Sequence, residues 1–142
     1  MTLTARELCQ KGGLHFETMQ KLLHAGVIPD DPAQRRAGPT RLCAVRRRYN
    51  EAALLAVRIA AAVMRIGGDS TDAIALLRYI ETLPDPVSFL ETAVLVKHRT
   101  RLLTDEDDRP GRIDWYGGEA EVPGVLGVPP TVYPLRAMLV LQ

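Results

Sequence analysis

Two glycine stops near the N-terminus constrain this chain more than any other feature. Gly12-Gly13 ends one apolar segment, and Gly26 ends a second segment that covers residues 16–25. The first segment opens with Thr4 and Glu7, a Thr-x-x-Glu capping box that typically starts a helix. Two short helices joined by a tight, glycine-containing turn form a helix-turn-helix. We therefore expect this unit at the start of the chain.

The apolar spacing also predicts which helix faces are buried. One face of the second helix is formed by Phe16, Met19, Leu22 and Leu23. A third helix is expected from Glu51 to about Ile66, with Asn50 as its cap. Apolar residues cover more than half of its circumference, so we expect it to be the central, most buried helix.

A fourth helix is predicted to start at residues 69–72, which supply a capping residue and acidic side chains for its first turn. Its inward-facing residues are expected to be Ile74, Leu77 and Ile80. Pro84 and Pro86 then end the helix and indicate a domain boundary. The predicted parts are a domain of residues 1–84 and an extension of residues 85–142.

The C-terminal extension has weaker local signals. A strand is favoured over 92–103, although a helix stays open, and 105–111 is expected to be a turn. Little regular structure is expected over 117–134, where Pro and Gly cluster. Residues 135–141 suit a short helix or a pairing strand, which either completes the core or forms a partner surface. The whole chain is predicted to be mainly α with a small β component.

Arginines are concentrated between the second and third helices. Residues 30–48 have no helical period and contain turn formers, which favours an irregular loop or a β-hairpin. The arginines of this segment are Arg35, Arg36, Arg41, Arg46, Arg47 and Arg48. Guanidinium groups suit phosphates and narrow minor grooves, so the segment indicates contact with nucleic acid. For Arg47, bracing the hairpin is an alternative role.

Formal charge is distributed unevenly along the chain. Residues 1–50 hold nine Lys or Arg and four acids, a net +5, whereas 51–83 carry −1 and 84–142 carry −3. A basic N-terminal third points to a polyanionic partner on that part of the chain. A solvated surface with chance clustering is the alternative.

The order of these signals, over residues 3–83, resembles the MerR-type winged-helix domain. The matching motifs are Glu7-Leu8-Cys9, Gly13-Leu14, Thr18-Met19 with Leu22, Gly26-Val27-Ile28-Pro29, Arg47-x-Tyr49-Asn50-Glu51, and Gly68-x-Ser70 with Ile74. The resemblance implies four helices, a β-hairpin wing and binding to double-stranded DNA. Gln20 and Leu22 stand where the family has arginine and tyrosine, and His15 replaces the usual cap. The family's long coiled-coil dimerisation helix is missing.

The solvent face of the second helix carries the candidate base contacts, because an α-helix fits the major groove. Its members are Glu17, Thr18, Gln20, Lys21 and His24. Gln20 can bond an adenine edge, Thr18 a phosphate or thymine methyl, and Lys21 a phosphate or guanine. A plain solvated face is the alternative. Tyr49 is predicted either to contact a phosphate or to lie at the edge of the core.

These features predict a DNA-binding protein, most simply a transcriptional regulator. An architectural DNA protein of excisionase or small-terminase type and an antitoxin-like protein-interaction module are the alternatives. A single winged helix covers little DNA, so a homodimer or larger assembly through residues 87–142 is expected. Footprinting separates the first two: one palindromic site would favour a regulator, and an extended array of repeats would favour an architectural protein.

Several classes of function are not expected. The chain has no GxSxG motif, no phosphate-binding loop and no nucleophilic triad spacing, so we do not expect an enzyme. Cys9 is predicted to be a buried helix residue and Cys43 a free thiol, and no metal or cofactor site is expected. No apolar run approaches the about 20 residues that span a membrane. The start of the chain has no secretory signal pattern, and a bacterial or phage-encoded protein of the cytoplasm is expected.

Overall fold

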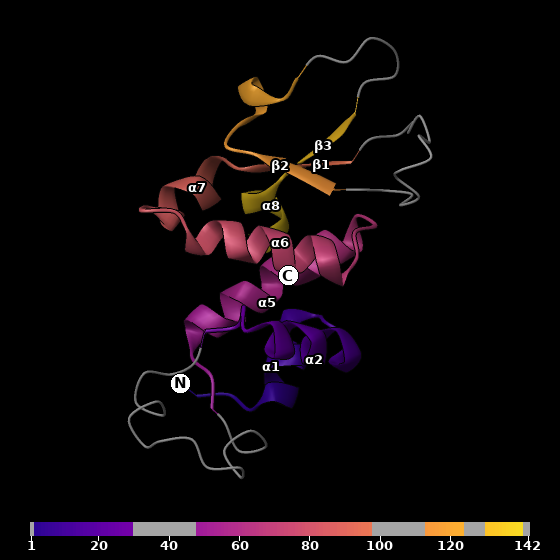
Figure 1. The fold of residues 1–142 in the computed structure, drawn as a ribbon, viewed down its shortest axis with the longest axis vertical. Coiled ribbons are helices and arrows are strands. Elements are labelled where there is room, and N and C mark those ends of the chain that lie inside the picture. Colours follow the sequence, from indigo (N-terminus) through magenta and orange to yellow (C-terminus); the bar gives the residue numbers. More distant parts are fainter. Residues whose placement is uncertain (1, 30–47, 98–112, 124–129, 141–142) are drawn as a thin grey trace.

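The computed structural model describes residues 2–29, 48–97, 113–123 and 130–140, which form a mainly helical molecule with one small sheet (Figure 1). In chain order the elements are α1 (Ala5–Gly12), α2 (Phe16–Ala25), α5 (Glu51–Arg65), α6 (Ser70–Glu81), α7 (Pro86–Thr92), β1 (Val94–Lys97), β2 (Ile113–Tyr116), the 3₁₀ helix η1 (Glu119–Glu121), β3 (Thr131–Pro134) and α8 (Leu135–Val140). The α1–α2 pair lies at one end and the sheet at the other, with α5 and α6 between them. The predicted class, mainly α with a small β component, is confirmed.

The first two helices begin and end at the predicted residues. The Thr4 hydroxyl accepts a hydrogen bond from the Glu7 N–H at 3.2 Å, and the Glu7 carboxylate accepts one from the Thr4 N–H at 3.2 Å. This reciprocal pair is the predicted capping box. Gly13 (φ 75°) and Gly26 (φ 74°) end the two helices in the left-handed conformation, which a residue without a Cβ adopts without strain.

Helix α5 is the central helix, as its composition predicted. Asn50 caps it by accepting hydrogen bonds from the Ala52 and Ala53 N–H groups at 3.1 and 3.3 Å. Its buried residues are Ala53, Leu54, Ala56, Val57, Ile59, Ala60, Ala61, Ala62 and Val63. Because so many of these side chains are single methyl groups, α1, α6 and α8 can all pack directly on α5.

Helix α6 starts at the predicted cap but is rotated from the predicted orientation. Asp69 and Asp72 exchange backbone-to-carboxylate hydrogen bonds of 2.9 and 3.1 Å across the first turn. The buried residues are Ala73, Leu76 and Leu77. Ile74 and Ile80, predicted to face inward with Leu77, are only half-buried at the edge of the core. Helix α6 packs on both α5 and α2, and Ala73 is completely buried.

Pro86 begins a helix, whereas the sequence analysis placed it only at a boundary. It occupies the first position of α7, where the missing N–H of proline has no cost. The Asp85 carboxylate caps this helix by accepting a hydrogen bond from the Ser88 N–H at 3.2 Å.

The sheet is antiparallel with strand order β2-β1-β3. Leu95 at its centre lies opposite Trp115 on β2 and Tyr133 on β3. Of the strand predicted over 92–103, the part Val94–Lys97 is confirmed as β1, whereas Thr92 is the last residue of α7 and residues 98–103 lie outside the described part of the chain. Strand β3 was not predicted, and the expectation of little regular structure over 117–134 is wrong there. A four-residue strand is too short to show a period, and its pairing with distant β1 leaves no local signal.

One continuous cluster of buried side chains links the N-terminal helices to the C-terminal elements. It runs from Leu3 and Leu8 through α5 to Leu95 and Leu135. Residues 135–140 form the helix α8, one of the two structures predicted there. Because Leu135 at its start is completely buried, this helix completes the core. Packing is thus unbroken across the boundary predicted near residue 84. No helix of the described residues is long and apolar enough to cross a membrane.

The predicted wing lies almost entirely outside the described residues. Arg35, Arg36, Arg41, Arg46 and Arg47 belong to that undescribed part, so a winged helix remains a prediction. Where the chain is described again, Tyr49 and Leu3 exchange two backbone hydrogen bonds of 2.8 Å. This bridge ties the end of the wing segment to the start of α1.

The contact of α1 with α5 gives a test of this packing. A Cβ on Gly12 would collide with Val57 Cγ1, so Gly12→Ala is expected to lower the free energy of unfolding by about 1–3 kcal/mol. Because Val57→Ala removes the colliding methyl, the Gly12→Ala penalty should shrink in that background. Urea unfolding of the four proteins of this cycle measures the coupling. Equal penalties in both backgrounds would show that α1 and α5 are not in close contact.

Candidate nucleic-acid interface

The turn between α1 and α2 holds the second helix in a fixed orientation. Leu14 is buried in this turn, and its N–H donates to the Cys9 carbonyl at 3.0 Å. Met19 and Leu22 of α2 are completely buried. With one side of α2 held in the core, its other side is presented to solvent at a defined angle.

Four of the five predicted base contacts gather on that solvent side. Glu17, Gln20, Lys21 and His24 line one open groove between α2 and α6, together with Ala25, Ile74 and Arg78. All four are exposed, whereas Thr18 is half-buried and does not line the groove. The structure therefore brings the predicted set together, except for Thr18.

Arg78 is a member of this groove that the sequence analysis missed. It is exposed on α6, and its Nη2 donates a hydrogen bond to the Ala25 carbonyl at 3.5 Å. Ile74 lies one turn before it, and an i, i+4 pair shares a helix face. Nothing in the local sequence shows that this face adjoins α2, because that contact depends on how both helices pack.

The predicted burial of Phe16 is wrong. Its side chain is 41% exposed, and the Arg6 guanidinium lies 5.6 Å from its ring centre in a cation–π contact. Phe16 and Leu22 are separated by about 120° around the helix axis, so a core centred on Met19 and Leu22 leaves Phe16 at the rim. Arg6, Gln10 and Phe16 line a shallow hollow at the N-terminal end of α2.

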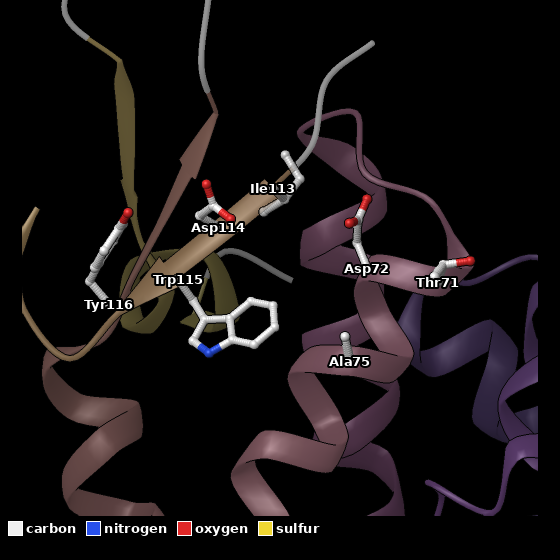
Figure 2. A pocket seen from close by; sticks show the side chains of 7 residues that line it. All are labelled: Thr71, Asp72, Ala75, Ile113, Asp114, Trp115 and Tyr116. Atoms are coloured by element: carbon white, nitrogen blue, oxygen red, sulfur yellow. The ribbon is translucent and has the colours of Figure 1, made fainter. Parts of the chain in front are cut away.

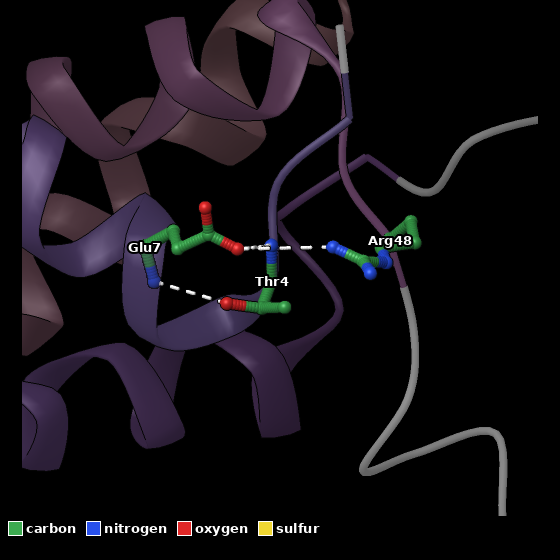
Figure 3. Close-up of polar contacts among 3 residues, drawn as sticks. All are labelled: Thr4, Glu7 and Arg48. Atoms are coloured by element: carbon green, nitrogen blue, oxygen red, sulfur yellow. Dashed lines mark hydrogen bonds and ion pairs between the residues drawn. The ribbon is translucent and has the colours of Figure 1, made fainter.

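Arg48 is the arginine of the wing segment that the structure describes, and it contacts α1. Its Nη1 lies 3.7 Å from Glu7 Oε1, with both side chains 50% exposed (Figure 3). The same carboxylate oxygen accepts the Thr4 N–H. Arg48 thus links the end of the arginine-rich segment 30–48 to the α1 cap, a role the sequence analysis considered for Arg47.

Tyr49 has to be removed from the candidate DNA contacts. Its side chain is only 2% exposed and belongs to the main buried cluster. Of the two predicted roles, the position in the core is the one observed. A phenol held there cannot present its ring to a duplex.

A second hollow lies at the far end of α6 and has the opposite electrostatic character. Its volume is about 470 Å³, and it is lined by Thr71, Asp72, Ala75, Ile113, Asp114, Trp115 and Tyr116. In Figure 2 the Trp115 indole extends from β2 toward α6, and the two carboxylates that line the hollow come from α6 (Asp72) and β2 (Asp114). The two carboxylates make this hollow a less favourable place for a phosphate than the α2–α6 groove.

Two further features bear on the chemistry of the described residues. Cys9 is buried, as predicted, and burial raises the pKa of its thiol, which makes it a poor nucleophile. No three His, Cys, Asp or Glu side chains gather to hold a metal ion within the described part of the chain.

Comparison with known protein families, curated proteins and solved structures finds no match to this chain. The resemblance to the MerR-type domain therefore stays a prediction that depends on the sequence motifs.

The α1 cap predicts how stability changes with pH. Hydrogen bonds from the Thr4 backbone N–H and hydroxyl lower the pKa of Glu7, and the Arg48 charge adds a smaller effect. A lowered pKa in the folded state stabilises the fold at pH values above the ordinary pKa of glutamate. This stabilisation is lost as the pH falls through the lowered pKa. Glu7→Gln should therefore reduce stability at neutral pH, with the difference from the wild type fading below about pH 4.

Urea unfolding between neutral and acidic pH measures this difference. Thr4→Ala removes the hydroxyl whose hydrogen bond helps to lower the pKa of the Glu7 carboxyl, so Glu7→Gln should have less effect in that background. If the free energies of unfolding of the wild type and Glu7→Gln differed by the same amount at every pH, the lowered pKa of Glu7 would be contradicted.

Proposed function

We propose that this chain binds double-stranded DNA, with α2 entering the major groove and the arginine-rich wing segment 30–48 contacting phosphates or the minor groove. The observation that carries the proposal is the two-sided character of α2. Met19 and Leu22 fix one side in the core, while Gln20, Lys21 and His24 line the open groove on the other. A rigid helix with an exposed polar face is what major-groove readout requires.

Each residue of the α2 face has a chemical role in this proposal. The Gln20 amide can both donate to and accept from an adenine edge, which makes it the main candidate for sequence recognition. Lys21 supplies a cation to a phosphate or a guanine. Glu17 can accept from a cytosine amino group, and it disfavours a phosphate at its own end of the helix. Thr18, being half-buried, is limited to a contact at the edge of the helix.

The N-terminal end of α2 has groups that attract phosphate, and they are opposed there by the Glu17 carboxylate in the same turn. Within the described residues, His15 makes no side-chain capping bond to this helix, so the first-turn N–H groups have no side-chain acceptor there. Such groups attract phosphate oxygens through hydrogen bonding and the helix dipole. Arg6, exposed above Phe16 at the same end, adds a positive charge.

Charge separation supports one orientation on the duplex. The exposed cations Arg6, Lys11 and Lys21 lie on α1 and α2, whereas Asp72 and Asp114 line the hollow at the other end. Long-range attraction would therefore turn the α1–α2 end toward a polyanion. A transcriptional regulator of the bacterial or phage cytoplasm, without enzymatic activity, is the function we favour.

Paired variants on the α2 face test this proposal. Lys21→Ala should weaken binding to all sequences and make the salt dependence shallower by about one unit, and Gln20→Ala should cost about 1–3 kcal/mol at the preferred site and relax its specificity. For the wild type, log K should fall against log salt with a slope near about −4 to −5 if about five phosphates are neutralised.

Fluorescence anisotropy across salt, using duplexes selected from a random pool, measures these quantities. Arg136→Ala, which removes an exposed cation from α8, serves as the matched control and should bind like the wild type. A wild-type protein that selects no duplex, or binding that ignores salt, would overturn the proposal.

A protein-interaction function is the second candidate, and one observation favours it. Val87 on α7 is 66% exposed and Tyr79 on α6 is 40% exposed, both large values for apolar side chains. Tyr79 also contacts Phe89 and Trp115, with ring centres 5.4 and 5.8 Å apart. Exposed apolar groups on an ordered frame suit a partner surface. This surface would serve self-assembly through residues 87–142 or an antitoxin-like contact.

Val87→Lys tests that surface without disturbing the core. If copies of the chain associate through α7, the variant should self-associate about tenfold more weakly, which corresponds to about 1.4 kcal/mol. Sedimentation velocity over a concentration series measures the change, and Ala120→Lys on η1 is the matched control. A wild-type protein that stays monomeric throughout would exclude self-association through α7.

A further inference from the structure

Arg78 connects α6 to the end of α2, and its position suggests more than a structural role. Its Nη2 donates to the carbonyl of Ala25, the last residue of α2. The same guanidinium lines the groove that contains Lys21 and His24. Three side chains that can carry positive charge are thereby placed around the C-terminal half of α2, and one of them comes from a different helix.

The end of a helix is ordinarily a poor place for an anion. Carbonyl groups without partners in the last turn carry the negative end of the helix dipole and repel phosphate. In α2 the Gly26 N–H donates to Leu23, the Val27 N–H donates to Leu22, and Arg78 donates to Ala25. The last turn is therefore largely satisfied, and a positive charge stands beside it.

We propose that Lys21, His24 and Arg78 form a binding site for one backbone phosphate of a DNA duplex, with Arg78 as the contact contributed by α6. This inference rests on the proposed function, because it places a phosphate beside the helix that enters the major groove. A guanidinium has five N–H donors in a planar fork, so bonding to Ala25 leaves donors that can bind phosphate oxygens. Glu17 lies in the same groove and is the acid that the phosphate must avoid.

Arg65 provides a matched control for this residue. It is also exposed, and its Nη2 donates to a distant carbonyl, that of Met138 on α8, at 3.3 Å. Arg65→Ala and Arg78→Ala thus each remove one positive charge and one long-range arginine-to-carbonyl bond. Only Arg78 lines the α2–α6 groove, so a structural role alone predicts similar effects from both variants.

The test compares Arg78→Ala, Arg78→Lys and Arg65→Ala in the full chain, by anisotropy against a selected duplex at several salt concentrations. Arg78→Ala should bind about tenfold more weakly at low salt, since a charge-assisted hydrogen bond is lost. Its salt dependence should become shallower by about 0.9 units, the value for one phosphate contact. Arg78→Lys should keep the wild-type salt dependence, because its charge remains, and recover part of the affinity.

Thermal unfolding of the same variants reports the structural contribution. Arg65→Ala should lower the Tm by an amount similar to Arg78→Ala while leaving the salt dependence unchanged. The phosphate site is overturned if Arg78→Ala keeps the wild-type salt dependence, or if Arg65→Ala changes it equally. Failure of the wild type to bind any duplex is a different outcome, which removes the proposed function itself.

Discussion

Close packing around α5 is the constraint on which the rest of the structure depends. Its buried side is rich in alanine, and Gly12 of α1 lies directly against Val57, where a Cβ would collide. Small side chains let three helices pack on one, so the C-terminal α8 and the N-terminal α1 share the same support. A change in volume along this helix would therefore disturb both ends of the molecule.

The candidate interface follows from that packing. Because α5 carries both α1 and α6, and α2 packs on α1 and α6, the exposed side of α2 faces a groove whose other wall is α6. Polar residues of α2 and the cation of Arg78 then meet, although they are distant in the chain. The acidic hollow between α6 and β2 lies beyond the same helix. Helix α6 thus contributes Ile74 and Arg78 to the groove, and Thr71, Asp72 and Ala75 to the hollow.

Short-range signals account for what could be predicted. Capping boxes and glycine stops act within a few residues, as in the pairs Thr4 with Glu7 and Asp69 with Asp72. The bounds of α1, α2, α5 and α6 could therefore be predicted from local chemistry. Side-chain orientation was less predictable. Phe16, Ile74 and Ile80 fit a helical period, yet they lie at the rim because neighbouring helices approach from directions that periodicity does not specify.

The sequence by itself determined the helical frame, the turn between the first two helices and the outward position of Glu17, Gln20, Lys21 and His24, because caps, glycine stops and apolar spacing are local properties. Only the tertiary structure decided that Tyr49 is buried, that Arg48 pairs with Glu7, and that Arg78 joins the α2 groove. It also decided the strands beside β1, whose hydrogen-bond partners lie far away in the chain. Each of these depends on contacts between distant segments, which form only when the core around α5 closes.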